Sequence, residues 1–231
     1  MRNALLLSAA LIASANALRV TVLGGTGFVG SRVVRKLVAD GGAEVTSVSR
    51  RGTAGIVAPW ASEPWTASVR WAASDLTRGP REEMREAIGE PDVVISCVGQ
   101  IGFDVQQNRV ANGVANVEAA RCVPGASRYV FVSVASEVAA AEGWLPDQLA
   151  GYFSGKRDAE EGFLEAAGEV GSCTFVKPSF IYGGDRFGLF PPRVTSAYGA
   201  AVRAHPHRSC THTASHKAPR CIPPMHSAGA P

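Results

Sequence analysis

Short apolar runs and amphipathic stretches alternate along most of the chain. Six runs rich in β-branched residues predict buried strands, at residues 18–23, 44–48, 69–73, 93–98, 128–133 and 173–177. Between several of them, apolar positions recur three and four residues apart and predict helices at residues 28–38, 108–122 and 147–167. Because strands alternate with helices, we expect an α/β fold with a doubly wound parallel sheet and right-handed crossovers.

The same pattern divides the chain into three parts. Residues 1–17 combine Arg2, an apolar run and Ala-x-Ala sequences, which is typical of a signal or targeting peptide; an N-terminal helix of a cytosolic protein is the alternative. Residues 18–203 are long enough to form one domain with its own core. Residues 204–231 hold all five histidines and no acidic residue, and no strand or helix period continues there. We expect a disordered tail, or the mistranslated end of a gene model.

Composition narrows the class of protein. With 46% hydrophobic and 19% charged residues, the chain is an ordinary globular protein. The net charge of +3 comes from the C-terminal end, since no acidic residue follows Asp185, so the folded body gives no indication of nucleic-acid binding. Five scattered cysteines favour a reduced compartment over a disulfide framework. No stretch after the leader is apolar enough to span a membrane, and the tail matches no zinc-site spacing, so no metal is assigned.

A glycine-rich loop joins the first predicted strand to the first predicted helix. Glycines at every third position would allow a tight turn, a close approach of the backbone to a pyrophosphate, and close packing of the helix on the sheet. The helix N-terminus would offer free N–H groups and the positive end of its dipole to the phosphates. The loop therefore predicts a dinucleotide site, with a ligand-free glycine turn as the alternative. The residues assigned to the cofactor are Gly24, Gly25, Thr26, Gly27, Phe28, Val29 and Gly30.

The end of the second predicted strand favours NADP(H) over NAD(H). An NAD site usually carries an acidic residue here, which holds the ribose hydroxyls. This chain has Ser49, Arg50 and Arg51 instead, and guanidinium groups suit a 2′-phosphate. The alternative is that one or both arginines are solvated loop residues.

A Tyr-x-x-x-Lys motif lies on the helix after the fifth predicted strand. Tyr152 and Lys156 are four residues apart, so both side chains are expected to point into one cleft. The nearby cation would lower the pKa of Tyr152 toward a useful acid–base range, and Lys156 would also contact the nicotinamide ribose. Ser133, at the end of the fifth strand, is the candidate third catalytic residue; a hydroxyl satisfied by the protein itself is the alternative.

These motifs resemble those of atypical short-chain dehydrogenase/reductases. The glycine loop, Ser-Cys-Val-Gly, Asn-Gly-Val-Ala-Asn and Gly-Tyr-Phe-Ser-Gly-Lys are similar to the group related to the NADPH-binding accessory subunit of respiratory complex I. Mitochondrial coenzyme Q biosynthesis relatives and their chloroplast counterparts resemble the chain more closely. The resemblance covers about residues 18–201. It implies further cofactor contacts at Asp75, Leu76, Cys97, Val98, Gly99, Pro178 and Ile181.

The same resemblance also concerns catalysis and substrate binding. It implies a substrate-orienting Ser or Thr near Ala135, and a C-terminal substrate-binding part that we expect to be truncated in this chain. Three functions follow: a reductase of a carbonyl, enone or quinone-like substrate, a non-catalytic NADPH-binding accessory protein of an organellar quinone or electron-transfer complex, and a redox sensor. The leader and the resemblance favour a plastid or a mitochondrion, with the secretory route as the alternative.

Overall fold

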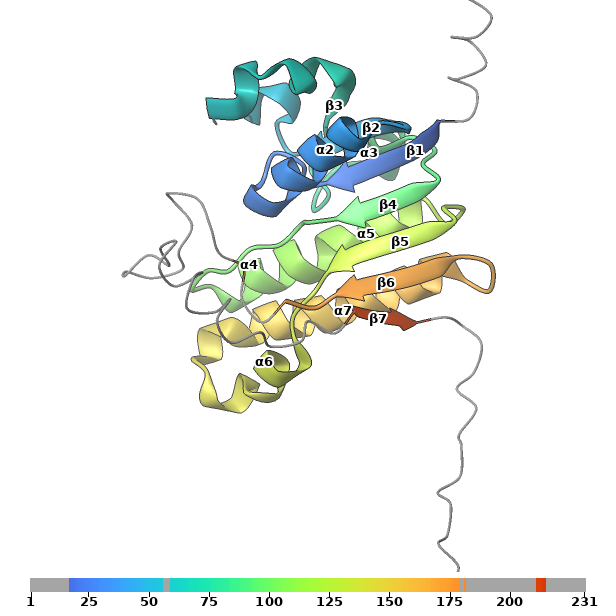
Figure 1. Cartoon of the computed structure of the whole chain (residues 1–231). Coiled ribbons are helices and arrows are strands. Elements are labelled where there is room, and N and C mark those ends of the chain that lie inside the picture. The colour runs from blue at the N-terminus through green and yellow to red at the C-terminus, as the bar shows by residue number, and fades with distance from the viewer. Residues whose placement is uncertain (1–16, 56–58, 179–180, 182–210, 215–231) are drawn as a thin grey trace, which may run out of the picture.

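A computed structural model describes residues 17–55, 59–178, 181 and 211–214 of the chain. They form one seven-stranded sheet in the order β3-β2-β1-β4-β5-β6-β7, in which the first six strands are parallel and β7 is antiparallel to β6 (Figure 1). The predicted doubly wound α/β fold is confirmed. The strands are β1 Leu18–Leu23, β2 Ala43–Ser49, β3 Val69–Ala73, β4 Val93–Ser96, β5 Arg128–Val132, β6 Ser172–Val176 and β7 Thr211–Ala214.

The helices connect the strands as right-handed crossovers require. They are α2 Phe28–Asp40, α3 Arg81–Ile88, α4 Val105–Arg109, α5 Ala115–Cys122, α6 Ser136–Ala140 and α7 Ala150–Ala167. A π-helical turn, Val110–Val114, joins α4 to α5. Short 3₁₀ turns cover Gly52–Gly55, Pro59–Ser62, Pro64–Ser68, Glu142–Trp144 and Asp147–Leu149. The sequence did not predict α3, because its only buried residues are the last apolar ones, at positions 84, 87 and 88.

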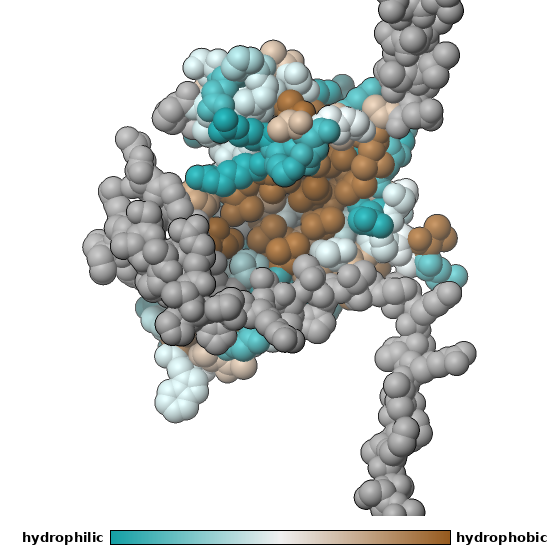
Figure 2. Space-filling model, viewed as in Figure 1, coloured by the Kyte–Doolittle hydropathy of each residue, from teal (hydrophilic) through white to brown (hydrophobic). Residues whose placement is uncertain are grey.

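Two apolar cores hold the sheet, one on each face. Valines of β1, β2 and β3 pack against Val34 of α2. On the other face, Tyr129 and Phe131 of β5 contact Phe163 of α7, with ring centroids 5.8 and 5.3 Å apart. Because side chains alternate along a strand, the residues of β4 and β5 that do not point into this second core point to the α2 side of the sheet. Within the described ranges no helix covers β4 and β5 there, and Figure 2 shows apolar side chains gathered on that surface.

Two tryptophans of the connection between β2 and β3 form a cluster with a third, Trp71, which lies in β3. The ring of Trp60 lies 5.2 Å from that of Trp65 and 6.1 Å from that of Trp71, between centroids. Trp65 and Trp71 also pack against the valine core under α2. The indole N–H of Trp71 donates to the carbonyl of Thr66 at 2.9 Å. These contacts fix the path of a connection that has no long helix.

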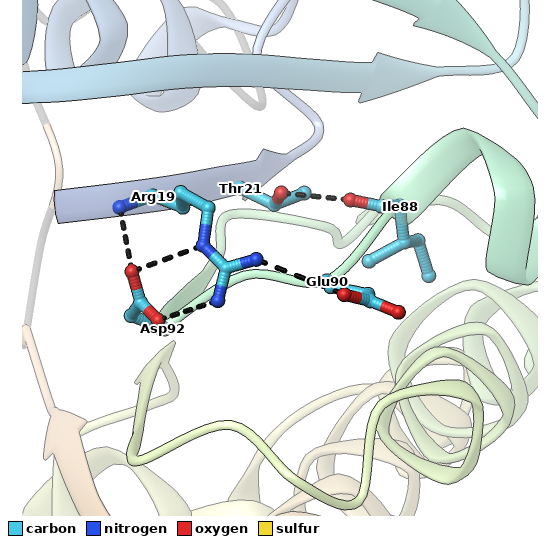
Figure 3. A network of polar contacts seen from close by, with 5 residues as sticks. All are labelled: Arg19, Thr21, Ile88, Glu90 and Asp92. Atoms are coloured by element: carbon cyan, nitrogen blue, oxygen red, sulfur yellow. Dashed lines mark hydrogen bonds and ion pairs between the residues drawn. The ribbon is translucent and has the colours of Figure 1, made fainter. Parts of the chain in front are cut away.

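The amino ends of the central strands are joined by a polar network around Arg19 (Figure 3). Its guanidinium donates to both carboxylate oxygens of Asp92, at 3.3 and 2.8 Å, and lies 3.8 Å from Glu90. The hydrogen bond from Arg19 holds the pKa of Asp92 below its ordinary value. Thr21 donates to the carbonyl of Ile88 at 2.9 Å. The network connects β1 to the turn before β4, at the end of the strands opposite the glycine loop.

Part of the segment predicted to lack regular structure is a strand. Thr211–Ala214 lies in the predicted tail 204–231 and pairs with β6, with Thr211 opposite Val176 and Ala214 opposite Cys173. The reason is physical: β6 offers an unpaired backbone edge, and threonines suit an extended strand. The predicted leader, residues 1–17, lies outside the described residues except for Ala17.

The structure bears on the state of the cysteines and on membrane-spanning helices, which the composition also addressed. Among the described cysteines, Cys97, Cys122 and Cys173 carry free thiols. In the part of the chain that the structure describes, no helix is both long and apolar enough to cross a membrane.

Candidate functional site

A cavity of about 270 Å³ opens at the carboxyl ends of β1, β2, β3 and β4. Here the chain leaves β1 toward one side and β4 toward the other, which is the switch point where open parallel sheets bind ligands. Eleven of the predicted cofactor residues line it: Gly24, Thr26, Gly27, Ser49, Arg50, Arg51, Asp75, Leu76, Cys97, Val98 and Gly99. The sequence did not single out the other lining residues: Val48, Ser74, Thr77, Gln100, Ala111 and Ala115.

The glycine loop has the backbone that the sequence predicts. Gly24 has a φ of +79°, a conformation that glycine adopts at little cost, and its N–H donates to the carbonyl of Val48 at 2.8 Å. Gly27 is the extended residue immediately before α2, and its N–H donates to the carbonyl of Gly24 at 2.9 Å. Because the first N–H groups of a helix lack partners one turn earlier, α2 offers donors to an anion beside Gly27.

The other loop glycines serve the packing of the loop and do not line the cavity. A methyl group on Gly30 would lie 2.2 Å from the carbonyl oxygen of Gly24, so a side chain there would push α2 away from the loop. One on Gly25 would lie 2.1 Å from the Oγ of Ser47 in β2. Phe28 and Val29 form the first turn of α2, where the ring of Phe28 lies 3.8 Å below the guanidinium carbon of Arg32.

Two exposed arginines, Arg50 and Arg51, border the cavity at the end of β2. After the next strand, β3, Asp75 accepts hydrogen bonds from the backbone N–H and the hydroxyl of Thr77, at 2.9 and 2.6 Å. The hydroxyl of Thr77 lowers the pKa of Asp75 most, and the charge of Arg50 lowers it further. Asp75 is therefore ionised at neutral pH, and one of its oxygens is already used by the turn that carries Leu76.

A ladder of three fully buried asparagines, Asn108, Asn112 and Asn116, holds the loop that follows β4. Asn108 donates to the carbonyl of Gly102 at 2.8 Å and accepts from its N–H at 2.9 Å. Asn112 makes the same pair of bonds with Gln100, at 2.6 and 3.3 Å. Asn116 donates to the carbonyl of Val98 at 3.4 Å.

The π-helical turn lies within the helical segment that carries this ladder, and such turns are frequent at functional sites. The sequence carried a signal for the ladder, because three asparagines four residues apart lie on one face of a helix and have to find partners when buried. Which backbone groups they bind depends on the conformation of the loop, which the sequence pattern does not specify.

Lys156 lies at the inner end of the site. It is only 5% exposed, and its ammonium donates to the carbonyl of Val132 at 2.7 Å, at the end of β5. A methyl group on Gly99 would lie 3.1 Å from its Nζ, so the ammonium borders the loop that lines the cavity. Burial lowers the pKa of Lys156 to about 8; the negative charge of Glu160 opposes this fall, as that of Cys97 does only when its thiol is ionised.

Tyr152 lies beside Lys156, as the four-residue spacing predicts, with Nζ 5.8 Å from the centre of its ring. The predicted lowering of its pKa is wrong: burial raises the pKa of Tyr152 above its ordinary value. Desolvation of the phenolate is the effect that decides the direction. At neutral pH the phenol is therefore protonated and can donate a proton or a hydrogen bond.

The hydroxyl of Ser133 is bound by the protein itself. It donates to the carboxylate of Glu160, whose other oxygen pairs with the ammonium of Lys177 at 2.8 Å. Ser133 is only 3% exposed, and its backbone N–H donates to the carbonyl of Val176 at 2.9 Å. The structure thus favours a hydroxyl satisfied within the protein for Ser133, and Glu160 and Lys177 are partners that the sequence analysis missed.

Pro178 and Ile181 follow β6. The carbonyl of Pro178 accepts a hydrogen bond from the N–H of Ala135 at 3.2 Å, which joins the segments after β5 and β6. Both residues are half-buried, and neither lines the cavity. Their predicted contact with a nicotinamide stays a prediction.

A profile of the NAD(P)H-binding family matches residues 24–188. The chain belongs to the NAD(P)H-binding family. The match begins at the first glycine of the loop and extends past the Tyr–Lys helix, and so includes every residue that lines the cavity.

Several known proteins are similar to the chain in sequence or in fold. An uncharacterized chloroplastic protein of Arabidopsis thaliana is 33% identical over 177 residues, which cover 75% of this chain and 54% of that protein. The UDP-glucuronic acid 4-epimerase of Bacillus cereus in complex with NAD is 15% identical, with a TM-score of 0.54 over 69% of this chain and 55% of its own.

A thiolation-reductase di-domain from an archaeal non-ribosomal peptide synthetase is 16% identical, with a TM-score of 0.55 over 70% of this chain and 51% of its own. Such low identities show the shared fold alone. The chain spans about half the length of these relatives. It is an NAD(P)H-binding domain with a Rossmann-like fold.

The cavity fits a dinucleotide. Gly27 leaves room for a phosphate at the N-terminus of α2, since within 4 Å of a methyl group placed there only the carbonyl oxygen of Gly24 would be met. Arg50 and Arg51 border the cavity beyond β2, and Lys156 lies behind Gly99 on the other side of β1. An NAD(P)H-binding domain with this layout can hold a pyrophosphate at its centre and place one end of the cofactor toward each basic group.

Proposed function

We propose that the chain binds NADP(H) in preference to NAD(H). The observation that carries the proposal is the pair of exposed arginines on the cavity rim after β2, where no carboxylate follows the strand. The nearest acidic group of the cavity, Asp75, uses one oxygen to hold Thr77. A 2′-phosphate would therefore meet two guanidinium groups and no acceptor placed for a free ribose hydroxyl.

The test is calorimetric titration of the full chain with NADPH and with NADH. A hydrogen bond to a charged group contributes about 1.5–3 kcal/mol, so Arg50→Ala and Arg51→Ala should each weaken NADPH binding by about tenfold or more and leave NADH binding unchanged. Arg128→Ala is the matched control, because Arg128 is exposed at the amino end of β5. Equal affinity of the wild-type protein for both cofactors would refute the preference, and a folded protein that binds neither would refute the site.

For the reaction, we propose reduction of a carbonyl or quinone-like substrate. The bound cofactor would supply a hydride to the substrate carbon. The protonated phenol of Tyr152 would give its proton to the substrate oxygen, and the ammonium of Lys156, 5.8 Å from the ring centre, would stabilise the phenolate that remains. Tyr152→Phe should abolish turnover in a screen of carbonyl and quinone substrates, while NADPH affinity stays within about twofold. Turnover that survives this substitution would refute the role of Tyr152.

A second candidate is a non-catalytic NADPH-binding protein of an organellar quinone or electron-transfer complex. The bond between Ser133 and Glu160 favours it, because the hydroxyl that would orient a substrate carbonyl is engaged, and Ala135 offers none. A partner complex isolated from the organelle, without NADPH turnover in any substrate screen, would support this role over the reductase. We propose a plastid as the organelle, and the chloroplastic Arabidopsis protein supports that choice over a mitochondrion.

A further inference from the structure

Glu160 lies one helical turn beyond Lys156, on the face of α7 that carries the Tyr–Lys pair. Residues 152, 156 and 160 are each four positions apart, which places them along one side of the helix. The carboxylate of Glu160 is held from two strands: by the hydroxyl of Ser133 after β5, and by the ammonium of Lys177 after β6. It is therefore fixed in position behind the inner end of the site.

The same carboxylate is connected to Lys156 through the end of β5. Lys156 donates to the carbonyl of Val132, and Ser133 is the next residue along the chain. A displacement of Ser133 would move the carbonyl that receives the ammonium. Glu160 thus acts on Lys156 in two ways, by its charge and by holding the acceptor in place.

The charged and titratable groups on the elements around Lys156 come from the ends of β4 and β6 and from α7 and α4. Cys97 faces it from the end of β4, Tyr152 and Glu160 from α7 itself, and Lys177 is the competing cation after β6. Arg109 and Asp158, between α4 and α7, pair with each other at 3.2 Å.

The two neutral groups in this set give no counter-charge. Burial raises the pKa of Cys97 to about 11 and raises that of Tyr152, so at neutral pH the thiol and the phenol are both protonated. Glu160 is then the anion that supports a charged Lys156, and its carboxylate is also paired with the ammonium of Lys177.

We propose that Glu160 is a positioning residue for the cofactor site, which keeps Lys156 charged and in place at neutral pH. The proposal rests on the proposed contact between Lys156 and NADPH. Its physical basis is that a buried ammonium loses the solvation that favours its charged form, and a fixed carboxylate nearby restores part of it. The competition with Lys177 makes a second prediction: removal of Lys177 should leave more of the carboxylate's field to Lys156.

Glu160→Gln tests the charge, because the amide keeps the shape of the side chain and an oxygen that accepts from Ser133. The titration of Lys156 would be followed by the NMR signal of its side-chain nitrogen between pH 6 and 10. We expect the midpoint of Lys156 to fall by about one pH unit from about 8 in Glu160→Gln. In Lys177→Met the midpoint should rise.

Cofactor affinity gives an independent reading of the same change. If NADPH requires charged Lys156, a midpoint lower by one pH unit weakens binding about fivefold at pH 8 and less than twofold at pH 6.5. Glu161→Gln is the matched control, since Glu161 is the exposed neighbour on the same helix, and it should leave both readings unchanged. Glu160→Asp keeps the charge, so the titration midpoint of Lys156 should stay close to that of the wild-type protein.

Each outcome decides between the two proposals. An unchanged Lys156 midpoint in Glu160→Gln, or an equal fall in Glu161→Gln, would overturn the role of Glu160. A fall in Lys177→Met in place of a rise would also overturn it, and this variant keeps the test valid if Glu160→Gln does not fold. If the midpoints move as expected but NADPH does not bind to the wild-type protein, the role of Glu160 in charging Lys156 stands and the proposed function fails.

Discussion

Replacement of Asn112 should release the loop after β4 from the helical segment that holds it. Its side chain is fully buried and makes three hydrogen bonds: two with the backbone of Gln100, at 2.6 and 3.3 Å, and one with the carbonyl of Asn108, at 2.8 Å. Each such bond contributes about 1 kcal/mol net, so Asn112→Ala should lower the free energy of unfolding by about 3 kcal/mol. That is a large fraction of the about 5–15 kcal/mol typical of a domain.

The same substitution should weaken cofactor binding. Gln100 lines the cavity, and a methyl group on Gly99 would lie 2.7 Å from the Oδ1 of Asn112, so the asparagine supports the loop from behind. A loop residue freed in the unbound protein has to be ordered again on binding, at about 1–2 kcal/mol. We therefore expect NADPH affinity to fall by about tenfold, measured by calorimetry at a temperature where the variant is folded.

Urea unfolding followed by far-UV circular dichroism measures the stability, with Gln107→Ala as the control because Gln107 is exposed one turn away. Asn112→Asp sharpens the test: its carboxylate would face the carbonyl oxygens of Gln100 and Asn108 without a donor. It should be less stable than Asn112→Ala at pH 7 and recover as the pH falls toward 4, where the acid is protonated. A loss below 1 kcal/mol in Asn112→Ala, or equal stability of the two variants at pH 7, would refute this account of the ladder.

Three further predictions follow from the loop and from the buried ionisable groups. Gly30→Ala should lower both the free energy of unfolding, by about 1–3 kcal/mol, and the affinity for NADPH. Gly27→Ala should lower mainly the affinity, because its methyl group would meet one oxygen at 3.1 Å and otherwise project into the space at the cavity wall. Urea unfolding and calorimetry distinguish the two variants, and Gly125→Ala, whose methyl group would meet no atom within 4 Å, should change neither reading. The pKa of Lys156 falls from 10.5 to about 8 on folding, so between these pH values the unfolded chain binds more protons and stability should rise with pH. Lys156→Met should remove this rise and be more stable than the wild-type protein at pH 7 by about 3 kcal/mol. An unchanged pH profile of stability in this variant would contradict the burial of the Lys156 charge. Because burial raises the pKa of Cys97 to about 11, its thiol should react slowly with a disulfide reagent at pH 8, and rapid labelling, located by mass spectrometry, would contradict this.

The fold was predictable because its signals are local. The apolar runs of β1 to β6 are buried strands whatever lies beside them, and the glycine loop carries its own backbone requirement at Gly24. The end of β2 was equally local, since Arg50 and Arg51 follow the strand directly. These features place the cavity without any knowledge of long-range contacts.

What the sequence could not supply are partners far apart in the chain. Ser133 and Glu160 are 27 residues apart, and nothing in either segment indicates that the hydroxyl meets this carboxylate. The pKa of Tyr152 was predicted in the wrong direction because the spacing shows the cation but not the burial of the ring. α3 was missed because its buried residues fill only about one turn at its end, which is too short for a helical pattern of apolar positions to be recognised.

The tryptophan cluster gives one half of the site an optical signal of its own. Trp60, Trp65 and Trp71 have ring centroids 5.2–6.2 Å apart, close enough for their excited states to couple and to produce a paired positive and negative band in circular dichroism. Trp60 and Trp65 lie on the β2–β3 connection, which also carries the arginines proposed to tell NADP from NAD, and Trp71 lies in β3. A change in that band on addition of NADPH but not NADH would therefore report the selecting half of the site alone, without any label attached to the protein.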